Sequence, residues 1–381
     1  MINGQFLFVT WSGGGNTAPT YPLARCLAAR GHKVTILGQA AQAEAARDLG
    51  ARFMPLDIPD WTPGKSLEEE PERALSLLFG PAVGEAVLNH MEREAPDVLV
   101  VDCMLTSGLA AAERAAIPSA AMVHVLYQQF VAGRMGLIWS SMLPMINETR
   151  RGLGLSPAES PGALMDPMDV VLVACPQEFD VAMPSLPRNI RYVGAILEDT
   201  PSPGSELLWQ REDGRPRVLV TLGTTCQHQE DALRRVAEAV AGLPVQAVIT
   251  VGSTVDLGVI DPSPNVAVHR YIPHRTLLPD CALVVTHAGL GTVMASLAHG
   301  VPLLCLPIGR DQHDNAARVA ACGAGVVLEV NAGVEEIRAT IGGMLASPHY
   351  GDAAHRMAAT MARQGGLSAA VTELEALRSA I

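Results

Sequence analysis

Residues 284–302 read VVTHAGLGTVMASLAHGVP, and this stretch gives the clearest indication of the fold class. Its first residues are apolar and β-branched, which predicts a short buried strand of a parallel sheet. Gly289 and Gly291 follow, and a helical pattern then runs to Gly300, a residue type that commonly ends helices. A strand that enters a helix through glycine gathers unpaired backbone N–H groups and the positive end of the helix dipole at one point. The stretch therefore predicts a Rossmann-type turn that suits a phosphate group, with a ligand-free βα turn as the alternative.

The next strand of the same sheet is predicted at residues 303–307, and a polar loop at 309–315 follows it. In a doubly wound sheet, ligands bind beyond the carboxyl ends of the strands. Two successive strand ends are therefore polar. The first suits phosphate, and the second, which contains Asp311 and Gln312, suits sugar hydroxyls.

The order of His287, Gly-x-Gly-Thr at 289–292, Gly-Val-Pro at 300–302 and Asp-Gln at 311–312 resembles the donor-binding signature of the GT-B nucleotide-sugar glycosyltransferases. Within them it resembles the macrolide and natural-product group of actinobacterial type, which is related to the plant and animal UDP-glycosyltransferases. The resemblance extends more weakly over nearly the whole chain. It implies an α/β protein of the GT-B class, with two Rossmann-like parallel-sheet domains facing a central cleft.

The composition of the 381-residue chain suits two domains and excludes several functions. The formal net charge is −12 and no basic run occurs, which argues against a nucleic-acid-binding protein. No run approaches the ~18 apolar residues of a membrane span, and the apolar run at 6–9 is too short for a signal sequence. The seven scattered cysteines lack a C-x-x-C pair, which favours reduced, buried thiols in a cytoplasmic protein and offers no metal site.

Strands and helices are predicted to alternate in both halves of the chain. Residues 1–197 would form an N-terminal acceptor-binding domain that opens with a βαβ unit. Residues 198–216 are rich in Pro, Ser, Gly and charge, and are the predicted linker. Residues 217–364 would form the donor-binding domain, and the resemblance implies that the helix at 365–381 returns to the N-terminal domain.

The resemblance also implies which residues hold the donor. Gly223, Thr224 and the turn at His287 would bind the diphosphate, where backbone amides and hydroxyls neutralise the charge that grows on the leaving phosphate. Residues 271–274 fall where the family surrounds the nucleotide base, and Asp311 falls where it contacts the sugar, with a plain helix cap as the alternative. The predicted donor set is Gly14, Gly15, Gly223, Thr224, Tyr271, Ile272, His274, His287, Gly289, Leu290, Gly291, Thr292, Asp311 and Gln312. No acidic metal cluster is visible, so we expect no metal and no cofactor, with the nucleotide-diphosphate sugar as a co-substrate.

Two positions depart from the family pattern. Many relatives carry a Glu eight residues after the motif His that reaches the ribose, but this chain has Ala295, so the choice between UDP and dTDP stays open. Relatives also place a catalytic His in the first loop, in a pattern like Gly-His-x-x-Pro, whereas Asn16 stands at that place here. An amide side chain cannot accept a proton at neutral pH. The family's partner carboxylate is present as Asp102.

Three interpretations of the catalytic base follow. Asp102 acts directly, His124 acts from the end of the neighbouring predicted strand, or an acidic acceptor such as a phenol needs little help. Each residue also has a structural alternative, with Asp102 as a helix cap and His124 as a hydrogen-bonded core histidine.

Residues 127–154 are rich in Met, Leu, Trp and Phe, and predict an apolar acceptor-binding region. A plain pair of core helices fits the same pattern, because methionine stripes usually serve packing. The candidate acceptor-binding residues are Trp11, Met135, Trp139 and Met142.

The sequence thus predicts an inverting, metal-independent glycosyltransferase that moves a sugar from a UDP- or dTDP-sugar to a small, partly apolar natural product of antibiotic or polyketide type. The alternatives are a nucleotide-sugar epimerase on the same fold and an accessory GT-B protein that has lost its base. The expected partners are the small-molecule donor and acceptor, without nucleic acid and without stable membrane insertion. A homodimer is compatible with the sequence.

Overall fold

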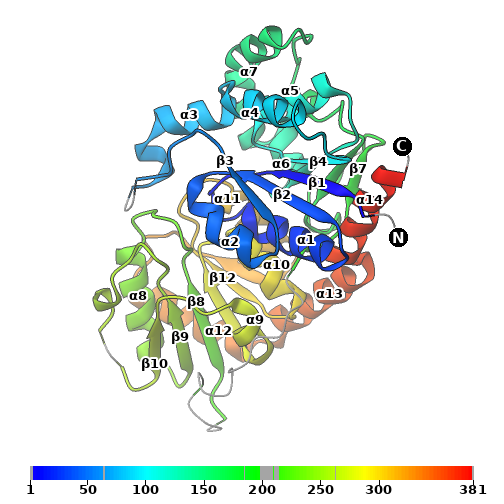
Figure 1. Cartoon of the computed structure of the whole chain (residues 1–381). Helices are drawn as coiled ribbons and strands as arrows, with labels where there is room; N and C mark the ends of the chain where they lie inside the picture. The colour runs from blue at the N-terminus through cyan, green and yellow to red at the C-terminus, as the bar shows by residue number, and fades with distance from the viewer. Residues whose placement is uncertain are drawn as a thin grey trace. The chain divides into compact units, whose positions relative to one another are not determined.

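The computed structural model describes residues 3–62, 65–183, 185–197, 209, 214–261 and 263–379 (Figure 1). The chain divides into two compact units, the first made mainly of residues 1–197 with 364–381, and the second mainly of residues 198–363. The linker predicted at 198–216 lies outside the described residues, except for Trp209 and 214–216.

The first unit is built on a seven-stranded sheet in which every strand pair is parallel. Its strands are β1 (Gln5–Val9), β2 (Lys33–Gly38), β3 (Arg52–Pro55), β4 (Val98–Asp102), β5 (Ser119–Val123), β6 (Val170–Val173) and β7 (Ile190–Tyr192). The strand order is β3-β2-β1-β4-β5-β6-β7, so the chain winds outward from β1 to β3 and then returns to β4 beside β1. The topological switch point, where ligands bind in such sheets, therefore lies between the carboxyl ends of β1 and β4.

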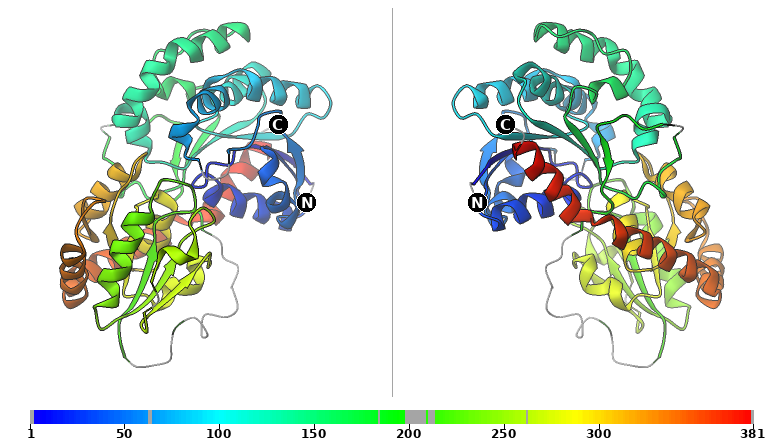
Figure 2. Two further views of the ribbon diagram at one scale, coloured as in Figure 1. Left: turned by 90° about the vertical axis from the view of Figure 1, so that its left-hand side faces the viewer. Right: turned by 90° about the vertical axis from the view of Figure 1, so that its right-hand side faces the viewer.

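Helices cover the sheet of the first unit. They are α1 (Thr17–Ala29), α2 (Ala43–Asp48), α3 (Pro71–Phe79), α4 (Ala82–Met91), α5 (Thr106–Ala115), α6 (Tyr127–Ala132), α7 (Arg134–Gly152) and the C-terminal α14 (Gly366–Ser379). Helix α14 packs against α1 and buries Ala370, Val371 and Leu374 in the core of this unit (Figure 2). Burial of such apolar side chains is worth roughly 1.5–3 kcal/mol for each large one, whereas the partly exposed ion pair between Glu375 and Arg30 adds little.

The second unit is built on a six-stranded parallel sheet in the order β10-β9-β8-β11-β12-β13. Its strands are β8 (Arg217–Thr221), β9 (Gln246–Thr250), β10 (Val266–His269), β11 (Leu283–Thr286), β12 (Leu303–Cys305) and β13 (Gly325–Val327). Its helices are α8 (Glu230–Ala241), α9 (His274–Leu277), α10 (Leu290–Ala298), α11 (Gln312–Ala321), α12 (Val334–Ala346) and α13 (Pro348–Gln364). Here the switch point lies between β8 and β11, which are neighbours in the sheet although two strands separate them in the chain.

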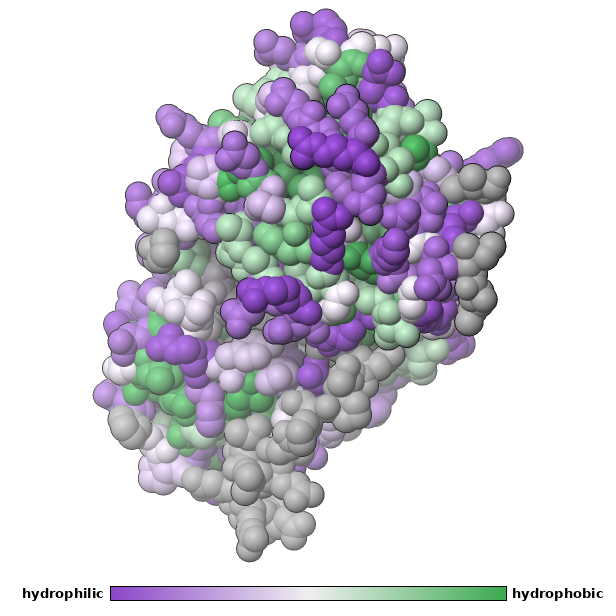
Figure 3. All heavy atoms as spheres, in the orientation of Figure 1, coloured by the Kyte–Doolittle hydropathy of each residue, from purple (hydrophilic) through white to green (hydrophobic). Residues whose placement is uncertain are grey.

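The predicted α/β class and the two parallel sheets are confirmed. Strands β4, β5, β9 and β11 are buried along their whole length, which explains why their sequences show apolar runs in place of alternation. Among the described residues, no helix is both long and apolar enough to span a bilayer. Figure 3 shows hydrophilic side chains over much of the visible face, with smaller hydrophobic areas between them.

Candidate active site

The switch point of the second unit brings together two of the predicted donor-binding turns. Thr221 at the end of β8 pairs with Thr286 at the end of β11, so Gly223 follows one strand and His287 the other. A Cβ atom at Gly223 or Gly289 would lie 3.1 Å or 2.7 Å from the His287 Nε2. Gly223 also has a φ of 96°, in the region that favours glycine. Both glycines are therefore needed to let the imidazole lie between the two turns.

The electrostatics of His287 favour its neutral form. Its pKa is lowered to about 4, mainly by burial; a backbone hydrogen bond with Thr221 opposes this shift, and the nearby Arg310 and His274 add to it. The ring is therefore uncharged at neutral pH and offers an anion one N–H at most. Positive potential at this point comes from the start of α10 and from Arg310.

The start of α10 supplies backbone donors for an anion. Gly289 is the N-cap residue, and the helix begins at Leu290, with Gly291 and Thr292 half-buried in its first turn. The first N–H groups of a helix lack intrahelical partners and lie at the positive end of its dipole. The residue before the cap, Ala288, adopts a left-handed conformation with a φ of 67°. This part of the predicted site thus has the geometry expected of a phosphate-binding turn.

The loop after β12 contains Asp311 and Gln312. The Gln312 side chain is buried, and its Oε1 accepts hydrogen bonds from the backbone N–H groups of Ile308 (2.8 Å) and Gly309 (3.1 Å). Its Nε2 donates to Gln227 Oε1 at 2.6 Å, in the loop after β8. Gln312 therefore fixes the loop geometry in this structure. Asp311 is half-buried and precedes α11 as its N-cap residue.

The residues predicted around the nucleotide base lie in three different environments. Tyr271 is 68% exposed, whereas Ile272 is buried in an apolar cluster of the second unit. His274 begins α9, and burial lowers its pKa to about 4. Thr224, also predicted in the donor set, is exposed in the turn after β8.

The switch point of the first unit contains Asn16, Asp102 and His124. The Asn16 Nδ2 donates to Asp102 Oδ2 at 3.0 Å and to the Trp11 carbonyl at 2.8 Å. The Asp102 Oδ1 lies 3.2 Å from His124 Nε2 and accepts from the Met104 N–H at 2.9 Å. Asp102 is 2% exposed and His124 9% exposed. The carboxylate is thus buried and fully hydrogen-bonded, with an amide on one side and an imidazole on the other.

The histidine of this unit has the opposite electrostatics to His287. Burial lowers the pKa of His124, but the Asp102 carboxylate and the Cys103 sulfur raise it more, so that the pKa lies well above the usual value. Burial raises the pKa of the Cys103 thiol, so the sulfur stays protonated. The ligand atoms of Asp102, Cys103 and His124 lie within 4.8 Å of one another and could hold a metal ion. Sequence spacing did not reveal this cluster, because its members follow two different strands.

The glycines of the first loop differ in their surroundings. Gly14 has a φ of 85°, whereas Gly15 is exposed and a Cβ there would meet nothing within 4 Å. Trp11 in the same loop is buried and contacts Trp61 edge to face, with ring centroids 6.1 Å apart.

The predicted acceptor-binding residues of α7 fall into two groups. Trp139 is buried and packs against Phe79 and Phe130, with ring centroids 4.9 Å and 4.8 Å away, so its ring belongs to the core. Met135 and Met142 are half-buried on the same helix. This matches the core-helix alternative for Trp139 and leaves the two methionines at the surface of the helix.

Sequence reasoning missed two residues of the second unit. Arg310 has a left-handed φ of 55°, and its Nη1 donates to Thr225 Oγ1 at 3.3 Å. Asn315 is fully buried in α11 and bonds to both predicted donor loops. The only sequence signal for either was the polar composition of 309–315.

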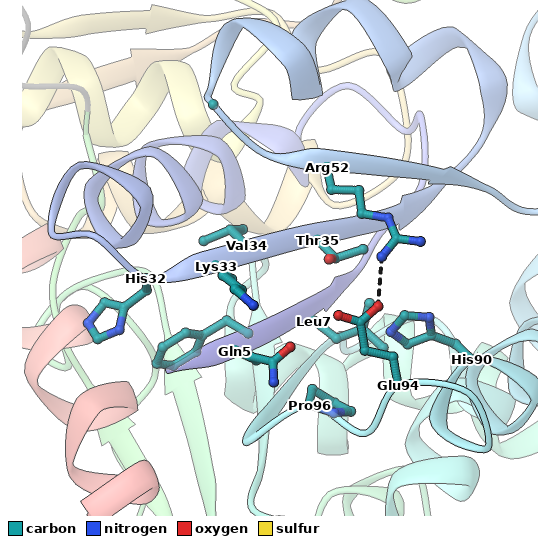
Figure 4. Close-up of a pocket in the computed structure, with 12 residues that line it drawn as sticks. Gln5, Leu7, His32, Lys33, Val34, Thr35, Arg52, His90, Glu94 and Pro96 are labelled. Carbon is teal, nitrogen blue, oxygen red and sulfur yellow. Dashed lines mark hydrogen bonds and ion pairs between the residues drawn. The ribbon is translucent and has the colours of Figure 1, made fainter. Parts of the chain in front are cut away.

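A cavity of about 450 Å³ lies at the amino ends of β1, β2 and β3 in the first sheet, opposite to the carboxyl ends that carry the candidate site (Figure 4). Gln5, Lys33 and Arg52 line it, with Arg52 paired to Glu94 at 2.7 Å and His90 beside them. None of the predicted site residues lines this cavity. Since ligands of doubly wound sheets bind at the carboxyl ends of strands, it lies apart from the candidate site.

Comparison with known proteins agrees with this fold. Residues 234–377 match the family described as erythromycin biosynthesis protein CIII-like, C-terminal domain, and residues 13–180 match the glycosyl transferase 4-like domain. The chain is 28% identical to 4'-demethylrebeccamycin synthase of Lentzea aerocolonigenes, over 99% of this chain and 100% of that protein. It is similar in structure to the calicheamicin glycosyltransferase CalG4, with a TM-score of 0.83 and 23% identity over 100% and 99% of the two chains. It is also similar to the glycosyltransferase VinC in complex with dTDP, with a TM-score of 0.71 and 21% identity over 99% and 100%.

Proposed function

Because this chain belongs to the GT-B nucleotide-sugar glycosyltransferases related to those of macrolide and antibiotic biosynthesis, we propose that it is an inverting enzyme acting on a small, partly apolar natural product. The donor is a dTDP- or UDP-sugar bound by the second unit. The observation that carries the proposal is the pair of switch points: one offers neutral N–H groups to a diphosphate, and the other offers a carboxylate–imidazole pair to a proton.

The donor is held by the turns after β8 and β11. The N–H groups of Leu290 and Gly291 at the start of α10, together with the uncharged His287, can meet the negative charge of the diphosphate. None of these groups is itself an anion that would repel it. As the bond between the anomeric carbon and the phosphate oxygen breaks, the nucleotide diphosphate leaves with the electron pair. Fixed donors that meet this growing negative charge lower the barrier.

The acceptor is activated by the first unit. We assign the base to His124 and its orientation to Asp102, because the imidazole is the more exposed of the two and the carboxylate already accepts three hydrogen bonds. The acceptor oxygen attacks the anomeric carbon from the side opposite the phosphate, which inverts the configuration, and its proton passes to the imidazole. Asn16 holds the far oxygen of Asp102 and takes no proton itself.

The proposal is tested by incubating the purified protein with dTDP- and UDP-glucose and a panel of phenolic, alcoholic and indole-type aglycones. Mass spectrometry should show a glycoside, and the anomeric proton coupling of the product should show inversion. An isomerised donor without glycoside would instead support the epimerase, and no product with either donor would support the accessory protein. A parallel arm with a chelator tests metal independence, which predicts an unchanged rate.

A further inference from the structure

Ala288 lies in a strained part of the phosphate-binding turn. It is a non-glycine residue with a φ of 67°, a conformation that L residues avoid for steric reasons. It stands between His287 and Gly289, so its conformation sets the direction of the imidazole and of the first helical N–H groups. Such a residue keeps its shape only when neighbouring groups hold it.

Two side chains hold the peptide groups of Ala288. The Ala288 N–H donates to Thr286 Oγ1 at 3.2 Å, and its carbonyl accepts from Asn315 Nδ2 at 3.0 Å. Thr286 and Asn315 are both fully buried, so neither bond competes with water. Thr286 ends β11, the strand that leads into the turn, whereas Asn315 lies in α11, which follows the neighbouring strand β12.

Asn315 also holds the second donor loop. Its Nδ2 donates to Asp311 Oδ2 at 2.8 Å, across the first turn of α11. An amide nitrogen carries two hydrogens, and here one goes to each loop. Among the residues that the structure describes, none hydrogen-bonds to the buried Asn315 Oδ1, so the described side-chain hydrogen bonds all come from the amide nitrogen.

We propose that Asn315 is a positioning residue that fixes the phosphate-binding turn and the sugar-facing carboxylate of Asp311 relative to each other. This inference rests on the proposed function, because it assigns the two loops to the two halves of a nucleotide sugar. A single buried amide then sets the separation between the diphosphate and the sugar hydroxyls. The enzyme thereby distinguishes a nucleotide sugar from the free nucleotide that it releases.

The test compares the affinities of dTDP and dTDP-glucose, and of the UDP pair, by calorimetry in wild type and Asn315→Ala. Loss of the two hydrogen bonds should weaken nucleotide-sugar binding by roughly tenfold. Nucleotide binding should weaken less, so that the ratio of the two affinities falls. The matched control is Asn265→Ala, whose amide bonds three backbone carbonyls just before β10, at the other end of the sheet. This control should leave the ratio unchanged.

Asn315→Asp adds a second measurement, the pH dependence of nucleotide-sugar affinity, which should not change if Asn315 only supports the fold. The introduced carboxyl would face Asp311, and two adjacent carboxylates raise the pKa of one of them. Below that raised pKa the two carboxyl groups share one proton, which restores the hydrogen bond to Asp311 but not the one to the Ala288 carbonyl, so nucleotide-sugar affinity should recover in part as the pH falls. Asp311→Asn combined with Asn315→Ala should also be non-additive, because both changes break the same link.

The outcomes separate the inference from the proposed function. If wild type binds neither nucleotide nor nucleotide sugar, the proposed function fails and the inference with it. If wild type binds both and folded Asn315→Ala keeps the wild-type ratio, only the inference is overturned. Should Asn315→Ala not fold, Asn315→Asp decides: affinity that does not rise as the pH falls overturns the inference.

Discussion

His124 and His287 each lie one residue after a buried parallel strand, His124 after β5 of the first sheet and His287 after β11 of the second, yet their electrostatics are opposite. A carboxylate at 3.2 Å raises the pKa of His124 beyond what burial lowers. His287 lies between glycine turns with no anionic partner among the described residues, and burial lowers its pKa to about 4. The charge of the nearest partner therefore decides whether a buried histidine at a strand end is held protonated or neutral.

The largest expected effect concerns the proton-exchanging histidine. His124→Ala should lower kcat by about 10²–10⁴-fold, because it removes the group that we propose as the base. The affinity for dTDP, measured by calorimetry, should stay within about twofold of wild type, because His124 lies in the first unit and the predicted donor-binding turns lie in the second. A tenfold change in affinity would need ~1.4 kcal/mol. His90→Ala is the control, because His90 is a buried histidine of the same unit that lines the distant cavity.

The rate should also depend on pH with a definite sign. A base must be neutral to accept a proton, and the raised pKa of His124 means that the wild-type rate increases with pH above the usual histidine range. Asp102→Asn removes the group that raises this pKa. The pH range over which the rate increases should therefore move to lower pH, while kcat falls. If the rate of Asp102→Asn increases over the same pH range as the wild-type rate, the assignment of the base is contradicted.

The second effect concerns stability in acid. Histidines of the unfolded chain titrate near pH 6.5, whereas His287 titrates at about 4 in the fold, so the folded state binds fewer protons between these values. Its contribution to stability is present above about pH 6.5 and is lost as the pH falls toward 4, by about 2 kcal/mol between pH 7 and 5. Urea unfolding followed by circular dichroism should show a correspondingly smaller loss in His287→Gln.

His124 should show the opposite dependence in the same experiment. Its folded pKa is raised, so its contribution is present below about pH 6.5 and is lost as the pH rises through the folded pKa. If wild type and His287→Gln lose the same free energy of unfolding as the pH falls, the contrast between the two histidines is contradicted.

The third effect is on donor binding. His287→Ala should weaken dTDP or UDP binding by about tenfold or less, because a neutral N–H contributes only ~0.5–1.5 kcal/mol. His299→Ala is the control, since His299 is exposed at the other end of α10. Calorimetry on the folded variants measures both. A much larger loss would mean that the bound nucleotide meets a charged imidazole.

The smallest effect is expected from Asn16→His, which installs the family's residue. The new imidazole would reach Asp102, to which the Asn16 amide now donates at 3.0 Å, and would compete with His124 for that carboxylate. Activity on weakly acidic alcohols should rise by a few-fold more than activity on phenols, which need less help from a base. The melting temperature should fall, because the bonds of the amide to Gly13 and Trp11 are lost. Initial rates on matched alcohol and phenol acceptors measure the difference.

Local sequence patterns are enough to predict the fold class and to place the predicted donor-binding turns at strand ends. Apolar runs bounded by glycine predict parallel strands, and the order of His287, Gly289 and Asp311 places polar groups at their carboxyl ends. These are local patterns, set by residues near one another in the chain. The missing base at Asn16 was equally visible, because it is a departure from a local motif.

The partners of these side chains follow from the tertiary fold and not from local sequence. His124 lies 22 residues from Asp102 in the chain, and Asn315 lies 27 residues from Ala288, so no spacing rule joins them. They meet because β4 pairs with β5 and β11 with β12, which brings the ends of those strands together. The pKa of each histidine and the partners of each amide follow from burial and from neighbours across the sheet, and these are fixed only when the parallel strands have paired.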